Sequence, residues 1–204
     1  IGLEAMPDTG GVLLLPNHIS YIDAVILQLA CPRPIRFLVY DEIYRARLLR
    51  WGLTLLGAIP ISPKKARTGI ETAVNALAKG EVVCLFPEGA LTRTATMQKL
   101  NRGYELIARK ARVPVMPIWL ENVWGSVFSY YGGHFFWKLP RVVPLRVWLY
   151  FGTPMAAAEA TAETVRRSLY DLAEQAFQAR PELQSHVGYE AIRGLRKRLF
   201  TPVI

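Results

Sequence analysis

Short apolar runs alternate with helical patterns between residues 10 and 151. Apolar runs of this length, bounded by Gly, Pro or polar residues, are typical of buried strands. We expect strands at residues 11–15, 35–39, 58–61, 82–86, 113–120 and 145–151. Strands that alternate with helices predict an α/β layered fold, in which a mostly parallel central sheet is flanked by helices.

The helical patterns carry start and stop signals of their own. Thr68-x-x-Glu71 has the form of a capping box that opens a helix, and Gly80 is expected to end that helix. A second helix is expected over about 98–112. Apolar residues at helical spacing over 165–176 predict an amphipathic helix that packs on the core.

The last part of the chain differs in character from the rest. A polar stretch after Pro181 leads to a basic helical segment over 191–199, which we expect to be a linker toward a further domain. The sequence also lacks an initiator methionine, so we expect it to come from a longer polypeptide. We therefore predict a core over 1–160 and a C-terminal helix with a basic linker over 161–204.

His18 and Asp23 lie where the first apolar run gives way to a helical pattern. A straight helix turns ~100° per residue, so two residues five apart would lie about 140° from each other. The spacing therefore brings them together only if His18 lies in the loop and Asp23 in the first helical turn. The carboxylate can then hold the imidazole as a general base. Spacing alone leaves a structural alternative open, because Ser20 and Asp23 also fit an N-terminal capping box.

Three further blocks follow or open predicted strands. They are Gly-Ala-Ile-Pro-Ile-Ser at 57–62, Phe-Pro-Glu-Gly at 86–89 and Val-Pro-Val-Met-Pro at 113–117. Together with Asn17, His18 and Asp23, which match the pattern Asn-His-x4-Asp, these blocks resemble in order and spacing those of the glycerolipid acyltransferase superfamily, typified by the 1-acylglycerol-3-phosphate acyltransferases. The resemblance covers roughly residues 10 to 155.

The resemblance implies that the core is catalytic, with His18 as the base and Asp23 as the residue that orients it. It also implies that Glu88 and Gly89 help to bind the acyl acceptor, and we add Asn17 and Ser20 as neighbouring candidates for substrate contact. The donor would be an acyl-coenzyme A or acyl carrier protein thioester, and we expect no bound cofactor and no metal. No Gly-x-Ser-x-Gly motif is present, which favours direct transfer over an acyl-enzyme intermediate.

Two departures from the family pattern concern the acceptor. In phosphatidic-acid-forming members the second block usually ends in an arginine that grips a phosphate, whereas Pro-Lys-Lys stands here at 63–65. The third block usually continues with Thr-Arg directly after the glycine, whereas Ala-Leu intervenes here before Arg93. Both features look closer to the acyltransferase domain of bifunctional 2-acylglycerophosphoethanolamine acyltransferase/acyl-carrier-protein synthetases.

We therefore expect re-acylation of a lysophospholipid, with Lys64, Lys65 and Arg93 as candidate phosphate contacts. Two alternatives remain. One is acylation of 1-acylglycerol-3-phosphate to phosphatidic acid, and the other is a catalytically silent membrane-binding module of a fused protein.

The net charge of +9 suits either nucleic acid or an anionic membrane surface. Zinc spacings, RNA-binding aromatic motifs and helix-turn-helix patterns are missing from the sequence, which disfavours nucleic acid. Arg45, Arg47 and Arg50 stand beside Trp51, a composition that suits the headgroup region of a membrane. The aromatic stretch 124–137 has three possible roles: a second anchor, the lining of an acyl tunnel, or core packing.

No apolar run reaches the ~18 residues of a spanning helix. The two cysteines have neither a disulfide nor a metal-binding pattern, which is typical of a reducing compartment. We therefore expect the protein at the cytoplasmic face of the inner membrane, either peripheral or as part of a larger membrane protein.

Overall fold

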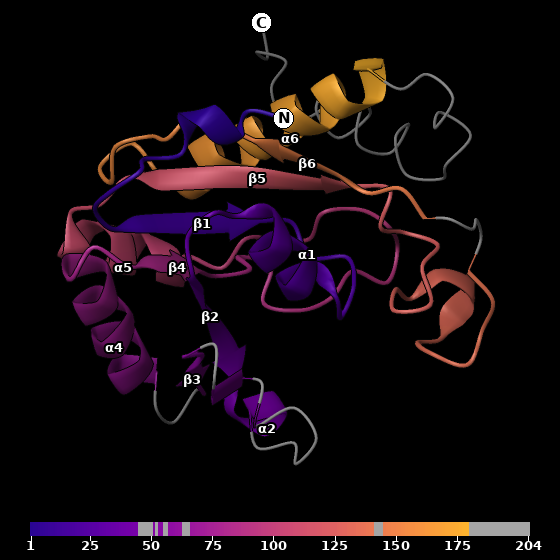
Figure 1. Cartoon of the computed structure of the whole chain (residues 1–204), viewed down its shortest axis with the longest axis horizontal. Helices are drawn as coiled ribbons and strands as arrows, with labels where there is room; N and C mark the ends of the chain where they lie inside the picture. The colour runs from indigo at the N-terminus through magenta and orange to yellow at the C-terminus, as the bar shows by residue number, and fades with distance from the viewer. Residues whose placement is uncertain (45–50, 52, 55–56, 63–65, 141–144, 180–204) are drawn as a thin grey trace, which may run out of the picture.

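A computed structural model describes the chain except for residues 45–50, 52, 55–56, 63–65, 141–144 and 180–204 (Figure 1). The described residues form one six-stranded sheet in the order β3-β2-β4-β1-β5-β6. Neighbouring strands are parallel, except that β6 runs antiparallel to β5. The strands are β1 (Val12–Pro16), β2 (Ile35–Tyr40), β3 (Ile59–Ile61), β4 (Val82–Cys84), β5 (Val115–Glu121) and β6 (Trp148–Phe151). The predicted α/β fold with a mostly parallel sheet is confirmed.

Helices cover both faces of this sheet. They are α1 (Asp23–Ala30), α2 (Asp41–Tyr44), α4 (Ala66–Ala78), α5 (Gly103–Ala111) and α6 (Ala162–Ala179), with short 3-10 turns η1 (Leu3–Ala5) and η3 (Tyr131–Gly133). Buried residues of α4, α5 and α6 share one hydrophobic cluster with Leu13 and Leu15 of β1. Val12 and Leu14 point to the opposite face and cluster with Leu27 of α1. All of β1 is buried as a result, because both of its faces are covered.

The helix start that we predicted from the capping box Thr68-x-x-Glu71 is wrong, and Ser20 does not serve as the N-cap residue of α1. α1 begins at Asp23 with Ile22 as its N-cap residue, so Ser20 lies outside the helix. α4 begins at Ala66, two residues before Thr68, and Glu71 pairs with Arg67 rather than with a cap. Each Ser/Thr-x-x-acid pattern also fits another local arrangement: Asp23 bonds to the loop over 18–20, and Glu71 forms an ion pair within the helix. The predicted end is confirmed, since Gly80 follows α4 with a positive φ of 83°.

The second predicted helix starts later than its pattern suggests. α5 begins at Gly103, not near residue 98. The backbone N–H groups of Gln98 and Asn101 instead donate hydrogen bonds to Glu88 and to the carbonyl of Pro87. Donors used in this way are not available for a helical ladder, so the segment before α5 is held to the turn that follows β4. Tertiary contacts therefore override the helical periodicity here.

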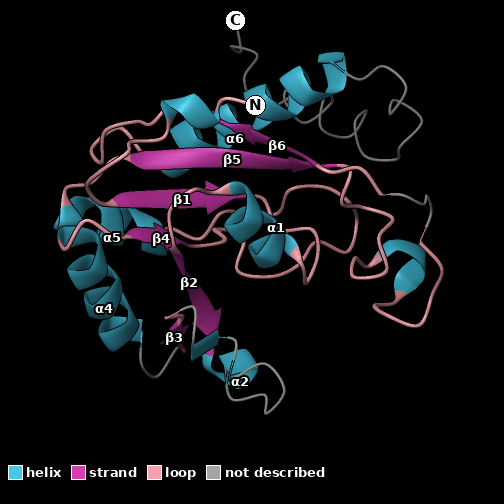
Figure 2. Ribbon diagram, viewed as in Figure 1, coloured by secondary structure: helices cyan, strands magenta, loops and turns pink. Residues whose placement is uncertain are grey.

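The connection between β5 and β6 contains the aromatic stretch and is mostly loop (Figure 2). It lies at the end of the sheet toward which β1 and β5 point, which is also the end where α1 begins. α6 packs on the sheet as the apolar spacing predicted, with Val165 and Leu169 fully buried. The basic segment over 191–199 lies outside the described residues. Within the described part of the chain, none of the helices combines the length and apolar character needed to span a bilayer.

Candidate active site

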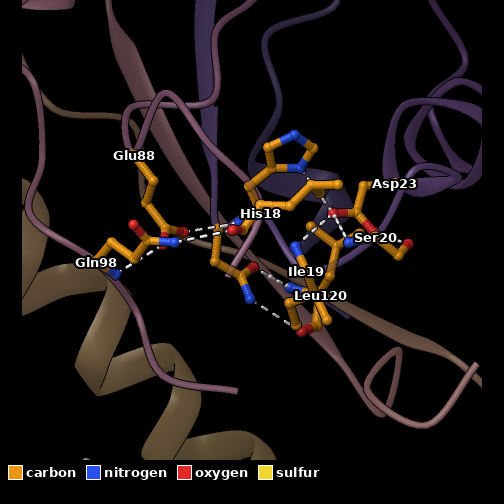
Figure 3. Close-up of polar contacts among 9 residues, drawn as sticks. His18, Ile19, Ser20, Asp23, Glu88, Gln98 and Leu120 are labelled. Atoms are coloured by element: carbon orange, nitrogen blue, oxygen red, sulfur yellow. Dashed lines mark hydrogen bonds and ion pairs between the residues drawn. The ribbon is translucent and has the colours of Figure 1, made fainter. Parts of the chain in front are cut away.

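His18 lies in the loop that follows β1, and Asp23 is the first residue of α1. The Nδ1 atom of His18 is 3.0 Å from the Oδ2 atom of Asp23 (Figure 3). The histidine side chain is 20% exposed, whereas the aspartate side chain is completely buried. The loop and first-turn placement expected from the spacing is confirmed. The structure thus joins a partly accessible imidazole to a carboxylate that water does not reach.

The buried carboxylate of Asp23 is compensated by four hydrogen bonds. Its Oδ2 atom accepts the backbone N–H of Ile19 at 2.7 Å and that of Ser20 at 2.9 Å, in addition to its contact with His18. Its Oδ1 atom accepts the hydroxyl of Ser20 at 2.5 Å. A buried charge is tolerated when its acceptors are satisfied in this way. These bonds also fix the direction of the carboxylate, so Asp23 serves both the loop and the imidazole.

The imidazole of His18 is held from a second side by an aromatic ring. Its centroid lies 3.9 Å from that of Phe86, with an angle of 21° between the planes. Asp23 accepts a hydrogen bond from the Nδ1–H group, which leaves the lone pair on Nε2. Nε2 has no hydrogen-bond partner among the residues that the structure describes, and it faces away from the labelled side chains in Figure 3. The arrangement can accept a proton from a molecule outside the protein.

Glu88 follows β4, which lies next to β1 in the sheet, so its side chain reaches the His18 loop across the strand ends. Its Oε1 atom accepts the backbone N–H of His18 at 2.8 Å, and its Oε2 atom accepts the backbone N–H of Gln98 at 2.7 Å. Burial raises the pKa of this carboxyl, partly opposed by the two hydrogen bonds. The structure thus has Glu88 holding the backbone of His18 to the segment before α5, where we had expected it to face an acceptor.

Other predicted substrate contacts also belong to the framework of the site. The side chain of Asn17 bonds both backbone groups of Leu120 in β5, at 2.7 and 3.2 Å, and is buried. Ser20 is buried as well, with its hydroxyl directed at Asp23. Gly89 has a φ of 71°, and a Cβ atom there would lie 2.7 Å from the amide nitrogen of Asn101. The turn and its side-chain neighbour are therefore sufficient to require a glycine at this position.

Arg93 is the predicted phosphate contact that the structure places near the site. The backbone N–H of Thr92 donates to the carbonyl of His18 at 3.0 Å, so the next residue, Arg93, stands beside the histidine loop. Its guanidinium lies over the ring of Tyr130, 5.1 Å from the centroid, and the residue is exposed. Lys64 and Lys65 lie outside the described residues.

The predicted membrane contacts are only partly visible. Arg45, Arg47 and Arg50 lie outside the described residues, whereas Trp51 is 78% exposed. The described part of the chain holds no group of three or more potential metal-ligating side chains.

Sequence reasoning missed how the aromatic stretch joins the site. Ser20 and Ser129 form an isolated antiparallel bridge, and the N–H of Tyr21 donates to the carbonyl of Phe128 at 3.3 Å. The ring of Tyr21 also packs edge-on against Phe135 at a centroid distance of 5.0 Å. No local pattern predicts a pairing between segments more than a hundred residues apart. The four-residue spacing of the apolar residues Tyr21, Val25 and Leu29 is the one feature of the sequence that could have directed attention to this side of α1.

Comparisons with known proteins agree on one family. A family model described as Acyltransferase matches residues 1–121, more than half of the chain. The 1-acyl-sn-glycerol-3-phosphate acyltransferase of Bacillus subtilis is 27% identical over 116 residues, which cover 56% of this chain and 57% of that protein. A chloroplastic 1-acyl-sn-glycerol-3-phosphate acyltransferase of Arabidopsis thaliana is 28% identical over 124 residues, covering 58% of this chain and 34% of that protein.

A solved structure shares the fold. The crystal structure of the 1-acyl-sn-glycerophosphate acyltransferase PlsC from Thermotoga maritima superposes with a TM-score of 0.67 at 20% identity, covering 92% of this chain and 72% of that one. The curated relatives are longer than their matched part, and the chain spans between about a third and just over half of their length.

Proposed function

Because this chain belongs to the acyltransferase family, we propose that it transfers a fatty acyl group from a thioester to the free hydroxyl of a lysoglycerolipid. One observation carries the proposal: a buried, fully bonded Asp23 holds His18 at 3.0 Å and leaves Nε2 without a protein partner in the described structure. The pair lies beyond the carboxyl ends of adjacent parallel strands, where ligands collect in sheets of this kind.

The geometry supports a direct transfer in two proton steps. Nε2 of His18 takes the hydroxyl proton of the acceptor as its oxygen attacks the thioester carbonyl. The tetrahedral intermediate then collapses, the C–S bond breaks, and the imidazolium returns its proton to the leaving thiolate. General-base assistance of this type contributes about 10²–10⁴-fold to the rate. Asp23 stabilises the imidazolium that forms between the two steps.

Glu88 supports this chemistry as a positioning residue. Its carboxylate holds the backbone N–H of His18, while Phe86 covers one face of the imidazole. The base is therefore held at its ring, by Asp23, and at its backbone, by Glu88. Such double support keeps a catalytic group within the narrow range of positions that efficient proton transfer needs.

We propose an acceptor whose phosphate carries an esterified headgroup, as in re-acylation of a lysophospholipid. Ala90 and Leu91 displace Arg93 from the position directly after Gly89, and Pro63 follows the second block where an arginine is usual in phosphatidic-acid-forming members. A single exposed guanidinium stacked on Tyr130 suits the one negative charge of a phosphodiester. The resemblance to the acyltransferase domain of bifunctional 2-acylglycerophosphoethanolamine acyltransferase/acyl-carrier-protein synthetases supports the same acceptor class.

A second acceptor is favoured by the comparisons. The curated relatives that match are named for 1-acyl-sn-glycerol-3-phosphate, a phosphomonoester, so formation of phosphatidic acid is the alternative. In either case we propose an acyl-coenzyme A or acyl-carrier-protein donor, a peripheral position on an anionic cytoplasmic membrane face, and a fused domain in the full-length protein.

A direct assay distinguishes the two acceptor hypotheses from each other and from a catalytically silent module. The purified chain is incubated with labelled acyl-coenzyme A or acyl carrier protein and with matched detergent micelles of lysophosphatidylethanolamine or lysophosphatidic acid. We expect a higher kcat/KM for lysophosphatidylethanolamine, and the reverse ranking would assign the chain to phosphatidic acid formation. If the folded chain forms no product with either acceptor or donor, the silent membrane-binding module is the correct reading. His18→Ala serves as the control for protein-dependent turnover.

A further inference from the structure

One side of α1 is apolar and faces solvent. Val25 is 54% exposed and Leu29 is 83% exposed, and Tyr21, which precedes the helix at the same four-residue spacing, is exposed as well. Leu27, on the other side of the helix, is completely buried against the sheet. Val25 and Leu29 lie four apart on one helix face and form a stripe, and Tyr21 lies in the turn that enters the helix. An isolated exposed leucine is unremarkable, but an unpartnered stripe indicates a contact surface.

The aromatic stretch extends this stripe. The ring of Phe136 stacks on that of Tyr21 with a centroid distance of 5.3 Å, and Phe128 meets Phe136 edge-on at 6.0 Å. Trp137, next in the chain, is 98% exposed. We call these exposed side chains together the aromatic surface: Tyr21, Val25, Leu29, Phe128, Phe136 and Trp137.

The backbone holds these aromatic side chains outward in an uncommon conformation. Phe136 and Trp137 have φ values of 58° and 50°, in the left-handed region that bulky residues rarely adopt. The ammonium of Lys138 fixes the loop by donating to the carbonyls of Ser129, Tyr131 and His134. The strained backbone therefore carries two aromatic side chains that remain exposed. Strain that is kept without burying the rings indicates a role in contact with something outside the protein.

The charge pattern around the surface is one-sided. The chain contains 16 acidic residues, yet none lies between 24 and 40 or between 122 and 140, the segments that supply most of the aromatic surface. The cations Arg93 and Lys138 lie beside it, one over the ring of Tyr130 and one within the loop. An apolar surface that has basic neighbours and is supplied mostly by segments without acidic residues complements an anionic lipid headgroup layer. Tyrosine and tryptophan are the residues that prefer that layer.

The aromatic surface also borders the candidate active site. The bridge between Ser20 and Ser129 and the hydrogen bond from Tyr21 to Phe128 tie it to the turn that carries His18 and Asp23. We propose that the aromatic surface docks on an anionic bilayer and thereby directs the His18 site toward the lipid. This proposal rests on the proposed function in that the acceptor is a lipid. It places membrane contact beside the site, on residues other than Trp51.

Vesicle sedimentation with the full chain tests this docking. The triple variant Val25→Ser/Leu29→Ser/Trp137→Ser removes three side chains that are each more than half exposed. The free energy of unfolding should therefore change little. With vesicles of phosphatidylglycerol and phosphatidylethanolamine, we expect at least about a tenfold loss of partitioning, because less apolar area is buried. Leu106→Ser is the matched control, since this exposed leucine lies on α5, across the sheet from α1. It should bind like the parent.

The proposal is overturned if the triple variant binds these vesicles as the parent does, or if Trp51→Ser lowers binding while the triple variant does not. It is also overturned if the surface proves to join two copies, with a parent dimer that becomes monomeric in the triple variant while vesicle binding stays unchanged. Turnover of a water-soluble short-chain acceptor separates this idea from the enzymatic proposal. If both proposals hold, the triple variant keeps that activity. A parent that binds vesicles through this surface yet turns over no acceptor would refute the proposed function alone.

Discussion

The turn around His18 and the aromatic surface beside it differ in how far their side chains are satisfied within the protein. In the turn, the carboxylate of Asp23 is completely buried and accepts four hydrogen bonds, and the carboxylate of Glu88 bonds two backbone N–H groups. On the aromatic surface, Leu29 and Trp137 remain almost fully exposed, and the backbone accepts left-handed conformations to keep the aromatic residues there.

The comparison shows which of the two regions has its interactions satisfied within the chain. The turn is satisfied internally apart from Nε2 of His18, so its polar groups define one rigid arrangement with a single open position. The aromatic surface has favourable burial still to gain from something outside the chain. Substitutions in the two regions should therefore affect different measurements, turnover in the first and partitioning in the second.

The largest effect is expected for His18→Ala. Removal of the base should lower kcat by about 10²–10⁴-fold. The fold should persist, because Asp23 keeps its bonds to the loop backbone and to Ser20. Turnover is measured with labelled acyl thioester, and folding is measured by circular dichroism and urea unfolding. Near-normal turnover by the folded variant would end the general-base proposal, and Trp137→Ser is the comparison that should leave turnover of a soluble acceptor unchanged.

Asp23→Asn should lower kcat by orders of magnitude and also destabilise the protein. A neutral amide oxygen in the place of Oδ2 would still accept the N–H groups of Ile19 and Ser20, but without the negative charge that strengthens these bonds. Hydrogen bonds to a charged group contribute about 1.5–3 kcal/mol, and those between neutral groups about 0.5–1.5 kcal/mol. Urea unfolding should thus distinguish this variant from His18→Ala. Equal stability of the two variants, combined with equal turnover, would show that Asp23 contributes through the imidazole alone.

Glu88→Gln should lower kcat by roughly tenfold with little change in KM, because a shifted base misplaces the proton transfer without removing it. The matched control is Glu81→Gln, which breaks an ion pair with Arg36 at 2.9 Å at the opposite end of β4. That control should retain full turnover. A rise in KM at constant kcat for Glu88→Gln would instead support the original expectation that Glu88 contacts the acceptor.

Stability should also depend on pH through Glu88. Burial raises the pKa of Glu88, so the folded protein binds this proton more tightly than the unfolded chain does. The stabilisation is complete below the unfolded pKa and is lost as pH rises through the folded pKa. The stability difference between the parent and Glu88→Gln should therefore shrink over that window. Urea midpoints measured across the acidic range test this, and a difference that grows with pH would contradict it.

Gly89→Ala tests the turn that follows the glutamate. The positive φ of 71° and the contact with Asn101 predict a destabilisation of about 1–2 kcal/mol, with no direct effect on a ligand. Urea unfolding measures this loss. If acceptor affinity falls while stability is unchanged, the glycine borders the substrate after all.

The sequence by itself determined the strands, the α/β class and the candidate pair, because each depends on short-range patterns. Apolar runs mark the buried strands, and the five-residue spacing of His18 and Asp23 is meaningful only at a loop-to-helix boundary. Membership of the acyltransferase family also rests on the sequence, through the family model that matches residues 1–121.

Only the tertiary structure decided what the remaining polar groups do. Glu88 bonds to His18 because β1 and β4 are neighbours in the sheet, an order that no local pattern encodes. Glu88 also accepts the backbone N–H of Gln98, so α5 begins later in the chain than its periodicity predicts. The aromatic stretch joins Tyr21 across more than a hundred residues. Hydrogen bonds and ring contacts between distant segments depend on where strands end in space, so they appear only once the sheet is assembled.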